Sequence, residues 1–301
     1  MPGKPFHRRV DGVLLLDKPL GVSSNAVLQR ARRAYGALRA GHTGTLDPLA
    51  SGLLPVCFGE ATKLSSEMLD AGKAYRAEIR LGIRTSTGDA EGDVLSDIRP
   101  DTNRDQFAAV LEQFRGEIEQ VPPMHSALKR NGQALYTLAR RGETVERPPR
   151  KVMIYRIDLV EFNGPLARIL VDCSKGTYIR VLAEDIGEML GCGAHLSALQ
   201  RTRVGDFRLD DAIALHLVEE AANRESIDGW LLPPDTLAAA RPRVDLSGEN
   251  AVRFRHGRLV GSCPGPDGTV RVYAQGGGFL GLGCLEDSVL SVQRGMNQEY
   301  S

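Results

Sequence analysis

The chain has 301 residues, of which 42% are hydrophobic and 25% are charged, as in an ordinary globular protein. Its 38 Lys and Arg balance its 38 Asp and Glu, so net charge alone does not favour a nucleic-acid partner. No apolar run approaches the roughly 18 residues of a membrane span, the N-terminus lacks the apolar region of a signal peptide, and five cysteines without a C-x-x-C pair argue against a disulfide framework and a zinc knuckle.

The N-terminal half predicts alternating strands and helices. The apolar segment 11–19 predicts a buried strand closed by a proline turn. Residues 23–36 predict a helix with Ser23 or Ser24 as its N-cap and Gly36 as its stop. After a glycine-flanked loop, the pattern predicts a strand at 53–58, a helix at 61–69, a half-buried strand at 74–83 and a helix at 105–116.

The C-terminal half begins with a polar, basic excursion at 121–152 around one short amphipathic helix. Next come predicted strands at 152–162 and 167–176, a helix at 177–190, a strand at 196–207, a proline-rich linker at 231–247, and short strands with glycine-rich turns at 268–296. The last segment favours a small β-barrel. We therefore expect an α+β body with a small all-β unit after it.

Charge is unevenly distributed along the chain. Residues 1–42 carry eight Lys and Arg against two Asp, and residues 128–156 carry eight against two Glu. Between them, residues 88–107 are acidic. Basic segments of this kind suit a phosphate backbone, although solvated helix faces that happen to balance would give the same pattern.

The loop "GHTGTLDPLASG" at 41–52 holds the first candidate for chemistry, Asp47. A phosphate-binding loop would need a lysine and a hydroxyl where this chain has Leu46, Asp47 and Pro48. A metal site would need a further ligand at short spacing from His42 and Asp47. Two readings remain: an Asp-Pro turn without catalysis, or an ionised nucleophile or general base beside a cation, for which Arg180 is a candidate.

Five segments carry a resemblance to a known family when they are taken together and in this order. They are "DGVLLLDKPLGVSS", "GHTGTLDPLASGLLPVCFGEATK", "KAYRAEIRLGIRTSTGDAEG", "VPPMHSALKRNGQALYTLARRG" and "CSKGTYIRVLAEDIGEMLG". The chain resembles the bacterial TruB family of tRNA pseudouridine synthases from about residue 10 to about residue 240. Ser51 stands where threonine is common, and the hydroxyl is retained.

The resemblance implies a fold and a domain division. The fold is α+β, the pseudouridine synthase fold, with a mixed, largely antiparallel central sheet flanked by helices. Residues 1–240 would form the catalytic domain, including an RNA-binding insertion at about 124–151. Residues 241–301 are similar to the small C-terminal PUA-like β-barrel of the bacterial members, an RNA-binding domain.

The resemblance also implies roles for individual residues. Asp47 matches the catalytic aspartate that attacks the uridine, Tyr75 matches a tyrosine that stacks on the flipped base and is implicated in proton removal from C5, and Arg180 matches the arginine that ion-pairs the aspartate. His42 matches a histidine that helps to extrude the nucleotide. The other implied contacts comprise Lys18 and Lys63, which shape the pocket and its approach, Tyr178 and Lys175, which line the site, and the insertion residues Arg140, Arg141, Arg147, Arg150 and Lys151, which contact phosphate.

The implied activity is isomerisation of uridine 55 in the T-loop of tRNA to pseudouridine. The reaction needs no cofactor and no metal, and the base must be flipped out of the folded RNA. Attack at C1′, attack at C6 and a glycal route all remain open. The implied partner is the T-arm of tRNA, with no membrane, guide RNA or protein partner, and the enzyme is expected to be monomeric and cytoplasmic. Two alternatives are a tRNA-folding chaperone in which catalysis is secondary, and a nucleoside or nucleotide enzyme.

Overall fold

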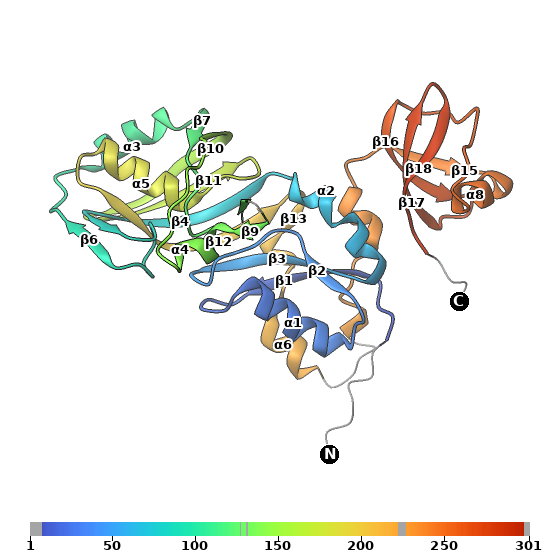
Figure 1. The fold of residues 1–301 in the computed structure, drawn as a ribbon, viewed down its shortest axis with the longest axis horizontal. Coiled ribbons are helices and arrows are strands. Elements are labelled where there is room, and N and C mark those ends of the chain that lie inside the picture. Colours follow the sequence, from blue (N-terminus) through green and yellow to red (C-terminus); the bar gives the residue numbers. More distant parts are fainter. Residues whose placement is uncertain (1–7, 127, 131, 222–226, 298–301) are drawn as a thin grey trace, which may run out of the picture.

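A ten-stranded sheet forms the body of the protein (Figure 1). The computed structural model describes residues 8–126, 128–130, 132–221 and 227–297. The strands of this sheet are β1 (Gly12–Lys18), β2 (Ala40–His42), β3 (Ala50–Phe58), β4 (Lys73–Leu81), β7 (Gly116–Gln120), β10 (Arg150–Asn163), β11 (Leu166–Cys173), β12 (Ala194–Val204), β13 (Phe207–Arg208) and β14 (Ile213–Ala214).

The strand order confirms the predicted mixed, largely antiparallel sheet. It runs β14-β1-β3-β12-β4-β11-β10-β7, with β2 paired to β3 and β13 paired to β12. Within this sheet, only β1 with β14 and β3 with β12 run parallel in the pairings that the structure describes. β12 therefore lies between β3 and β4, and this central place brings the segments that carry the candidate site together.

Helices cover the two halves of the sheet separately (Figure 1). α1 and α6 pack together beside β1, whereas α3 and α5 lie over the half that contains β4, β10 and β12. The helices of the body are α1 (Ser24–Tyr35), α2 (Ser65–Leu69), α3 (Arg104–Gln113), α4 (Leu135–Ala139), α5 (Ile179–Met189) and α6 (Leu215–Glu220), with short 3-10 helices η1 (Gly59–Leu64), η2 (Leu209–Asp211) and η3 (Pro234–Ala238).

The first helix shows its predicted capping. Ser23 is the N-cap, with its side chain accepting a hydrogen bond from the backbone N–H of Ala26. Gly36 ends the helix in the left-handed conformation, at φ 58°, which glycine adopts without steric cost. The helix predicted at 61–69 is divided: its first part is the 3-10 helix η1 and only its second part, α2, is α-helical.

The cores of the body explain why the apolar patterns predict its elements well. Leu14 and Leu16 of β1 pack in the cluster under α1, whereas Val13 and Leu15 pack in a second cluster on the opposite face. A strand that is buried on both faces reads as a continuous apolar run. In the other half of the sheet, α5 packs on β12 and β4, and its Ile179, Leu182 and Ile186 join one core cluster with residues of β4, β11 and β12.

The C-terminal unit is a four-stranded sheet rather than a closed barrel. Its strands are β15 (Arg243–Leu246), β16 (Gly268–Ala274), β17 (Phe279–Glu286) and β18 (Val289–Gly295), paired in that order. In the described part of the chain, β15 and β18 do not pair with each other. α8 (Gly248–Arg255) contacts all four strands, and its Phe254 fills their core, so a helix covers the apolar face that a closed barrel would enclose.

The proline-rich segment 231–247 is not the linker that its composition suggests. Leu237 and Ala238 of η3 are buried in the same cluster as Val13 and Leu15 of β1. Leu282 of β17 joins this cluster, so the C-terminal sheet packs on the body through it. The prolines and alanines of this segment suggest a linker, because the apolar residues that bury it belong to strands that are distant in the sequence.

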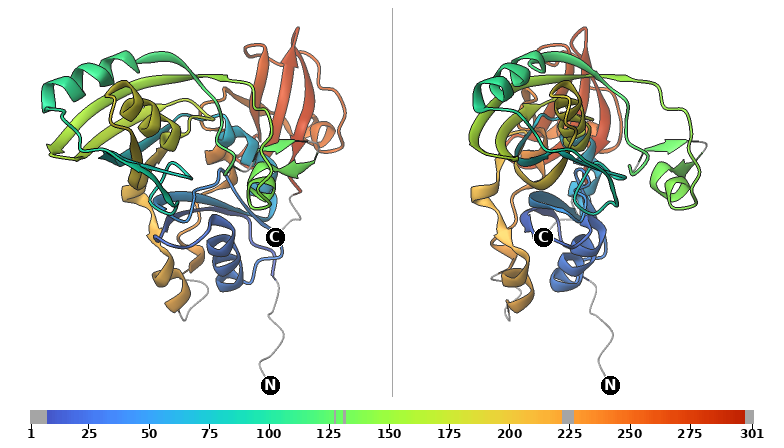
Figure 2. Two further views of the ribbon diagram at one scale, coloured as in Figure 1. Left: turned by 60° about the vertical axis from the view of Figure 1, so that its left-hand side comes forward. Right: turned by 90° about the vertical axis from the view of Figure 1, so that its left-hand side faces the viewer.

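The basic excursion forms an arm that projects from the body between β7 and β10 (Figure 2). It contains α4 and a two-stranded sheet of β8 (Lys129–Arg130) and β9 (Gln133–Ala134). A second two-stranded sheet, β5 (Ile83–Thr85) with β6 (Val94–Asp97), follows β4. Among the residues described, none of the helices is long and apolar enough to cross a membrane.

Candidate functional site

Asp47 stands on a loop, residues 43–49, that joins β2 to β3 and is fixed by its backbone. Ser24, the first residue of α1, accepts a hydrogen bond from the Leu46 N–H at 2.8 Å and donates one to the Leu46 carbonyl at 2.8 Å. The N–H of Gly21 donates to the carbonyl of Pro48, also at 2.8 Å. The Asp47 loop therefore presents its carboxylate in a fixed position, as the glycine-flanked pattern predicts.

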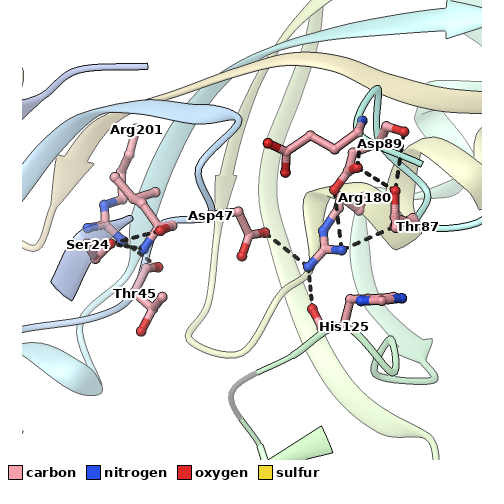
Figure 3. Close-up of polar contacts among 10 residues, drawn as sticks. Ser24, Thr45, Asp47, Thr87, Asp89, His125, Arg180 and Arg201 are labelled. Carbon is pink, nitrogen blue, oxygen red and sulfur yellow. Dashed lines mark hydrogen bonds and ion pairs between the residues drawn. The ribbon is translucent and has the colours of Figure 1, made fainter. Parts of the chain in front are cut away.

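Arg180 holds the carboxylate of Asp47 (Figure 3). Its Nη2 lies 3.0 Å from Oδ2 of Asp47, and its side chain is only 6% exposed whereas that of Asp47 is 43% exposed. Arg180 is the second residue of α5, a helix whose apolar face anchors it in the core. The cation that the sequence requires for Asp47 is thus present, and it is held beneath an accessible carboxylate.

The other donors of Arg180 are also engaged. Nη1 lies 3.4 Å from Oδ2 of Asp89 and donates to the carbonyl of Thr87 at 3.1 Å. Nη2 also donates to the carbonyl of His125 at 2.7 Å. A guanidinium presents its donors in a fixed plane, so these four partners determine its orientation. Asp89 and Thr87 come from the loop between β5 and β6, and His125 comes from the arm (Figure 3).

Tyr75 lies in β4, next to the site and half-buried. It stands opposite Arg201 in the register of β4 with β12, and the two side chains interact electrostatically. Burial raises the pKa of the Tyr75 hydroxyl, and the charge of Arg201 opposes this shift. Asp47 also acts on this pKa, which places the carboxylate and the ring in one electrostatic environment.

Tyr178 and Lys18 share that environment. Burial raises the pKa of Tyr178, on which Arg180 and Asp47 also act. Lys18 ends β1 as a fully buried lysine whose Nζ donates to the carbonyls of Pro19 and Val22. Burial lowers its pKa to about 8, and Asp47 opposes the shift. Asp47 therefore acts electrostatically on both residues.

His42 ends β2 directly before the Asp47 loop. Burial lowers the pKa of its imidazole, and Arg201 lowers it further. Its Nδ1 is buried without a hydrogen-bond partner in the described residues. A neutral, unpaired ring at this position is consistent with the implied contact to a nucleotide.

Two lysines expected at the site make their contacts elsewhere. Lys63 pairs with Glu60 at 2.6 Å and donates to the carbonyl of Gly295 at 3.0 Å, which places it at the junction between η1 and the C-terminal sheet. Lys175 is 60% exposed and pairs with Asp70 at 2.6 Å. The sequence alone does not show that Lys63 pairs with Glu60 or that Lys175 pairs with Asp70.

The basic residues of the arm differ in their surroundings. Arg140 and Arg141 are exposed after α4, and Arg140 lies over the ring of Tyr136 at 5.6 Å. Lys151 is exposed and pairs with Glu117 at 2.7 Å. Arg147 and Arg150 line a cavity of about 400 Å³ at the base of the arm, together with Pro122, Leu128, Leu135 and Pro148.

The arm reaches the site at two points. The carbonyl of His125 accepts a hydrogen bond from Arg180. The charge of Arg150 also acts on the pKa of Tyr178. The arm, which carries the exposed arginines, therefore contacts the Asp47–Arg180 pair directly through its backbone.

Sequence reasoning missed two charged residues of the site. Asp89 lies in the "STGDAEG" segment, where it is only one of several acids in an acidic stretch. Arg201 lies in the predicted strand at 196–207, and nothing in the local pattern distinguishes it from Arg203. Each residue gains its role from a partner that is distant in sequence, Arg180 for Asp89 and the Asp47 loop for Arg201.

Comparison with protein families covers nearly the whole chain. Residues 32–179 match the profile described as "TruB family pseudouridylate synthase (N terminal domain)". Residues 180–239 match "tRNA pseudouridylate synthase B C-terminal domain", and residues 242–296 match "Pseudouridine synthase II TruB, C-terminal".

Individual relatives agree over their full lengths. The protein named tRNA pseudouridine synthase B of Dechloromonas aromatica (strain RCB) is 55% identical over 286 residues, covering 94% of each chain. The protein of the same name from Pseudomonas aeruginosa (strain UCBPP-PA14) is 49% identical over 288 residues, covering 94% of this chain and 95% of that protein.

Solved structures share the fold. A chain from "Crystal Structure of a Cbf5-Nop10-Gar1 Complex" superposes with a TM-score of 0.71 at 31% identity, covering 91% of this chain and 78% of that chain. A chain from "Structure of H/ACA RNP bound to a substrate RNA containing 2'-deoxyuridine" superposes with a TM-score of 0.73 at 26% identity, covering 95% and 85%. These matches confirm the expected pseudouridine synthase fold.

Proposed function

The chain belongs to the TruB family of pseudouridine synthases, and on this premise we propose that it isomerises a uridine of tRNA, the T-loop uridine at position 55, to pseudouridine. The names of relatives at 55% and 49% identity support tRNA as the substrate. The observation that carries the proposal is the pair of Asp47 and Arg180, an accessible carboxylate held on a rigid loop by a buried guanidinium.

Asp47 is the proposed nucleophile. The isomerisation breaks the C1′–N1 bond of the nucleotide and forms a C1′–C5 bond, while a proton leaves C5 and N1 gains one. No atom is lost and no electron is exchanged with a co-reactant. A carboxylate can open such a sequence by covalent attack on the nucleotide. Arg180 fixes the Asp47 carboxylate before the substrate arrives, and such preorganisation lowers the cost of reaching the reactive geometry.

Tyr75 is the proposed platform for the flipped base. Taking a base out of its stack loses stacking energy, which an aromatic side chain partly restores. The raised pKa keeps the Tyr75 hydroxyl protonated at neutral pH in the free enzyme, and its ring is half-buried beside Asp47. His42 and Tyr178 would contact the nucleotide, and Lys18 would shape the pocket from beneath.

The arm is the proposed clamp on the T-arm. Arg140 and Arg141 would contact phosphate, and Arg147, Arg150 and Lys151 would continue the basic surface to the site. Folded RNA is recognised largely by its shape and backbone, which suits an arm of exposed arginines. An enzyme with its own clamp needs no guide RNA, so we propose that it acts alone, as a monomer in the cytoplasm.

The C-terminal sheet is proposed as a second RNA-binding unit. We assign residues 1–240 to catalysis and residues 241–301 to this unit. The family profiles, which end at 239 and begin at 242, support the division.

A tRNA-folding chaperone is the main alternative. Burying Arg180 against Asp89 is costly, and a protein that only binds RNA gains nothing from directing this cation to an accessible carboxylate. Mapping of pseudouridine in a tRNA transcript after incubation with the protein tests the proposal. We expect modification at the T-loop uridine alone, whereas an unmodified transcript would refute the activity and modification elsewhere would refute the position.

A further inference from the structure

Arg201 is a buried cation in the centre of the sheet. It lies on β12, opposite Gly52 of β3 on one side and opposite Tyr75 of β4 on the other. Its exposed fraction is 1%, and it is among the largest fully buried side chains of the described residues. The mechanism above does not use it, so its burial beside the site needs a reason.

The guanidinium of Arg201 is held by backbone carbonyl oxygens. Nε donates to the carbonyl of Leu53 at 2.8 Å, Nη2 to that of Gly44 at 3.1 Å and Nη1 to that of Thr45 at 3.5 Å. Tyr75, opposite Arg201 in the register of β12 with β4, interacts with it electrostatically. Within the described ranges, no carboxylate pairs with it. A fully buried arginine normally has a carboxylate partner, and here the Asp47 loop takes that place.

These contacts give the two arginines complementary places around Asp47 (Figure 3). Arg180 holds the carboxylate of Asp47, whereas Arg201 holds the backbone of the same loop two and three residues earlier. Figure 3 shows Asp47 between the two guanidinium groups. Arg201 also stands opposite Tyr75 in the register of β12 with β4, so a single residue links the loop of the proposed nucleophile to the strand that carries the proposed base platform.

We propose that Arg201 is a positioning residue of the reaction, which fixes the Asp47 loop relative to the Tyr75 ring without touching the RNA. The inference rests on the proposed function. Arginine is required because its planar fork can meet several carbonyls at once, whereas a lysine ammonium is a single point of charge. Arg201→Lys therefore keeps the charge and loses the geometry.

The first test compares Arg201→Lys with Arg203→Lys. Arg203 lies on the same strand but is 31% exposed and pairs with Asp172 at 3.5 Å. We expect Arg201→Lys to lower kcat on T-arm RNA by about 100-fold, the loss typical of a reacting group displaced by about 1 Å, with KM unchanged. Arg203→Lys should keep both constants. A purely structural defect would instead lower the folded fraction, which thermal unfolding of each variant reports.

The second test disturbs the same contact from the loop. Gly44 has a φ of +126°, so a Cβ there would strain the backbone and shift the carbonyl that Arg201 binds, although the Cβ itself would meet Nη1 of Arg201 only in ordinary contact at 3.7 Å. A Cβ on Gly41, in β2, would meet nothing closer than Thr62 Cγ2 at 4.0 Å. We expect Gly44→Ala to lower kcat and Gly41→Ala to preserve it. If Arg201→Lys does not fold, the comparison of Gly44→Ala with Gly41→Ala tests the positioning role instead.

The outcomes separate this inference from the proposed function. If folded Arg201→Lys keeps the kcat of wild type, the positioning role is wrong but the synthase activity still stands. If Arg201→Lys does not fold, an unchanged kcat in Gly44→Ala leads to the same conclusion. A parallel loss of RNA binding and kcat in folded Arg201→Lys also overturns it, because positioning predicts unchanged KM. An inactive wild-type protein overturns the proposed function itself.

Discussion

Arg180 binds two carboxylates of very different exposure, Asp47 at 3.0 Å and Asp89 at 3.4 Å. The side chain of Asp89 is 4% exposed and that of Asp47 is 43% exposed. Asp89 therefore belongs to the support of the site, and Asp47 is the member of the trio that a substrate can reach. This asymmetry underlies the predictions that follow.

Removing Arg180 should destabilise the fold as well as the chemistry. Arg180→Met leaves the buried carboxylate of Asp89 without its cation, and such losses typically cost about 3–5 kcal/mol. We expect urea denaturation to show this decrease in the free energy of unfolding. Arg203→Met, which removes a partly exposed arginine paired with Asp172, should cost about 0–1 kcal/mol. Equal effects in the two variants would show that Arg180 does not support a buried charge.

The ring of Tyr75 should matter more for catalysis than its hydroxyl. Tyr75→Phe keeps the aromatic surface and loses only the hydroxyl, whereas Tyr75→Leu loses stacking worth about 1–3 kcal/mol per base. We expect kcat/KM on T-arm RNA to fall further in Tyr75→Leu than in Tyr75→Phe. If Phe and Leu caused the same loss, the platform role would be wrong.

Lys18 should make stability depend on pH in the alkaline range. Burial lowers its pKa to about 8 from an ordinary 10.5, so between these values the unfolded chain binds more protons than the folded protein. The free energy of unfolding therefore increases as pH rises from about 8 towards 10.5, and below about pH 8 this increase is absent. We expect the free energy of unfolding of wild type to rise relative to that of Lys18→Met from about pH 8 to about pH 10.

A control for this pH effect is Lys175→Met, which removes a 60% exposed lysine. Its difference from wild type should change far less over the same range. A difference between wild type and Lys18→Met that stays constant with pH would contradict the burial argument.

The arm should bind RNA through phosphate contacts that depend on salt. Each lost phosphate contact reduces the slope of log affinity against log salt by about 1. The double variant Arg140→Gln, Arg141→Gln should therefore reduce the slope by about 2, measured on T-arm RNA by titration. Arg168→Gln is the matched control, because Arg168 is already paired with Glu78 and Glu161. An unchanged slope in the double variant would remove the arm arginines from the interface.

Local pattern predicts the regular elements of this fold well. The buried strand at 11–19, the capped helix at 23–36 and the amphipathic helix at 177–190 depend on neighbours in sequence and on burial alone. The C-terminal barrel and the proline-rich linker fail for a different reason. α8 covers the small sheet, and the partners that bury Leu237 come from β1 and β17, which are distant in sequence.

The candidate site divides in the same way. Asp47 and Arg180 are predictable, because a carboxylate on a rigid loop requires a cation and the family blocks supply one. Arg201 and Asp89 depend on a strand order that places β12 between β3 and β4 and on a turn that returns to α5. The acidic partners of Lys63 and Lys175 arise from packing that no local pattern records.

Tritium release from tRNA labelled at C5 of uridine tests the central claim most directly. Pseudouridine formation expels the C5 hydrogen, so release counts turnovers. Asp47→Asn preserves the size of the side chain and removes its charge, and RNA binding measured in parallel shows that the variant is intact. We expect wild type to release tritium and Asp47→Asn to release none at unchanged affinity for tRNA. Continued release by Asp47→Asn would contradict the assignment of Asp47 as the nucleophile.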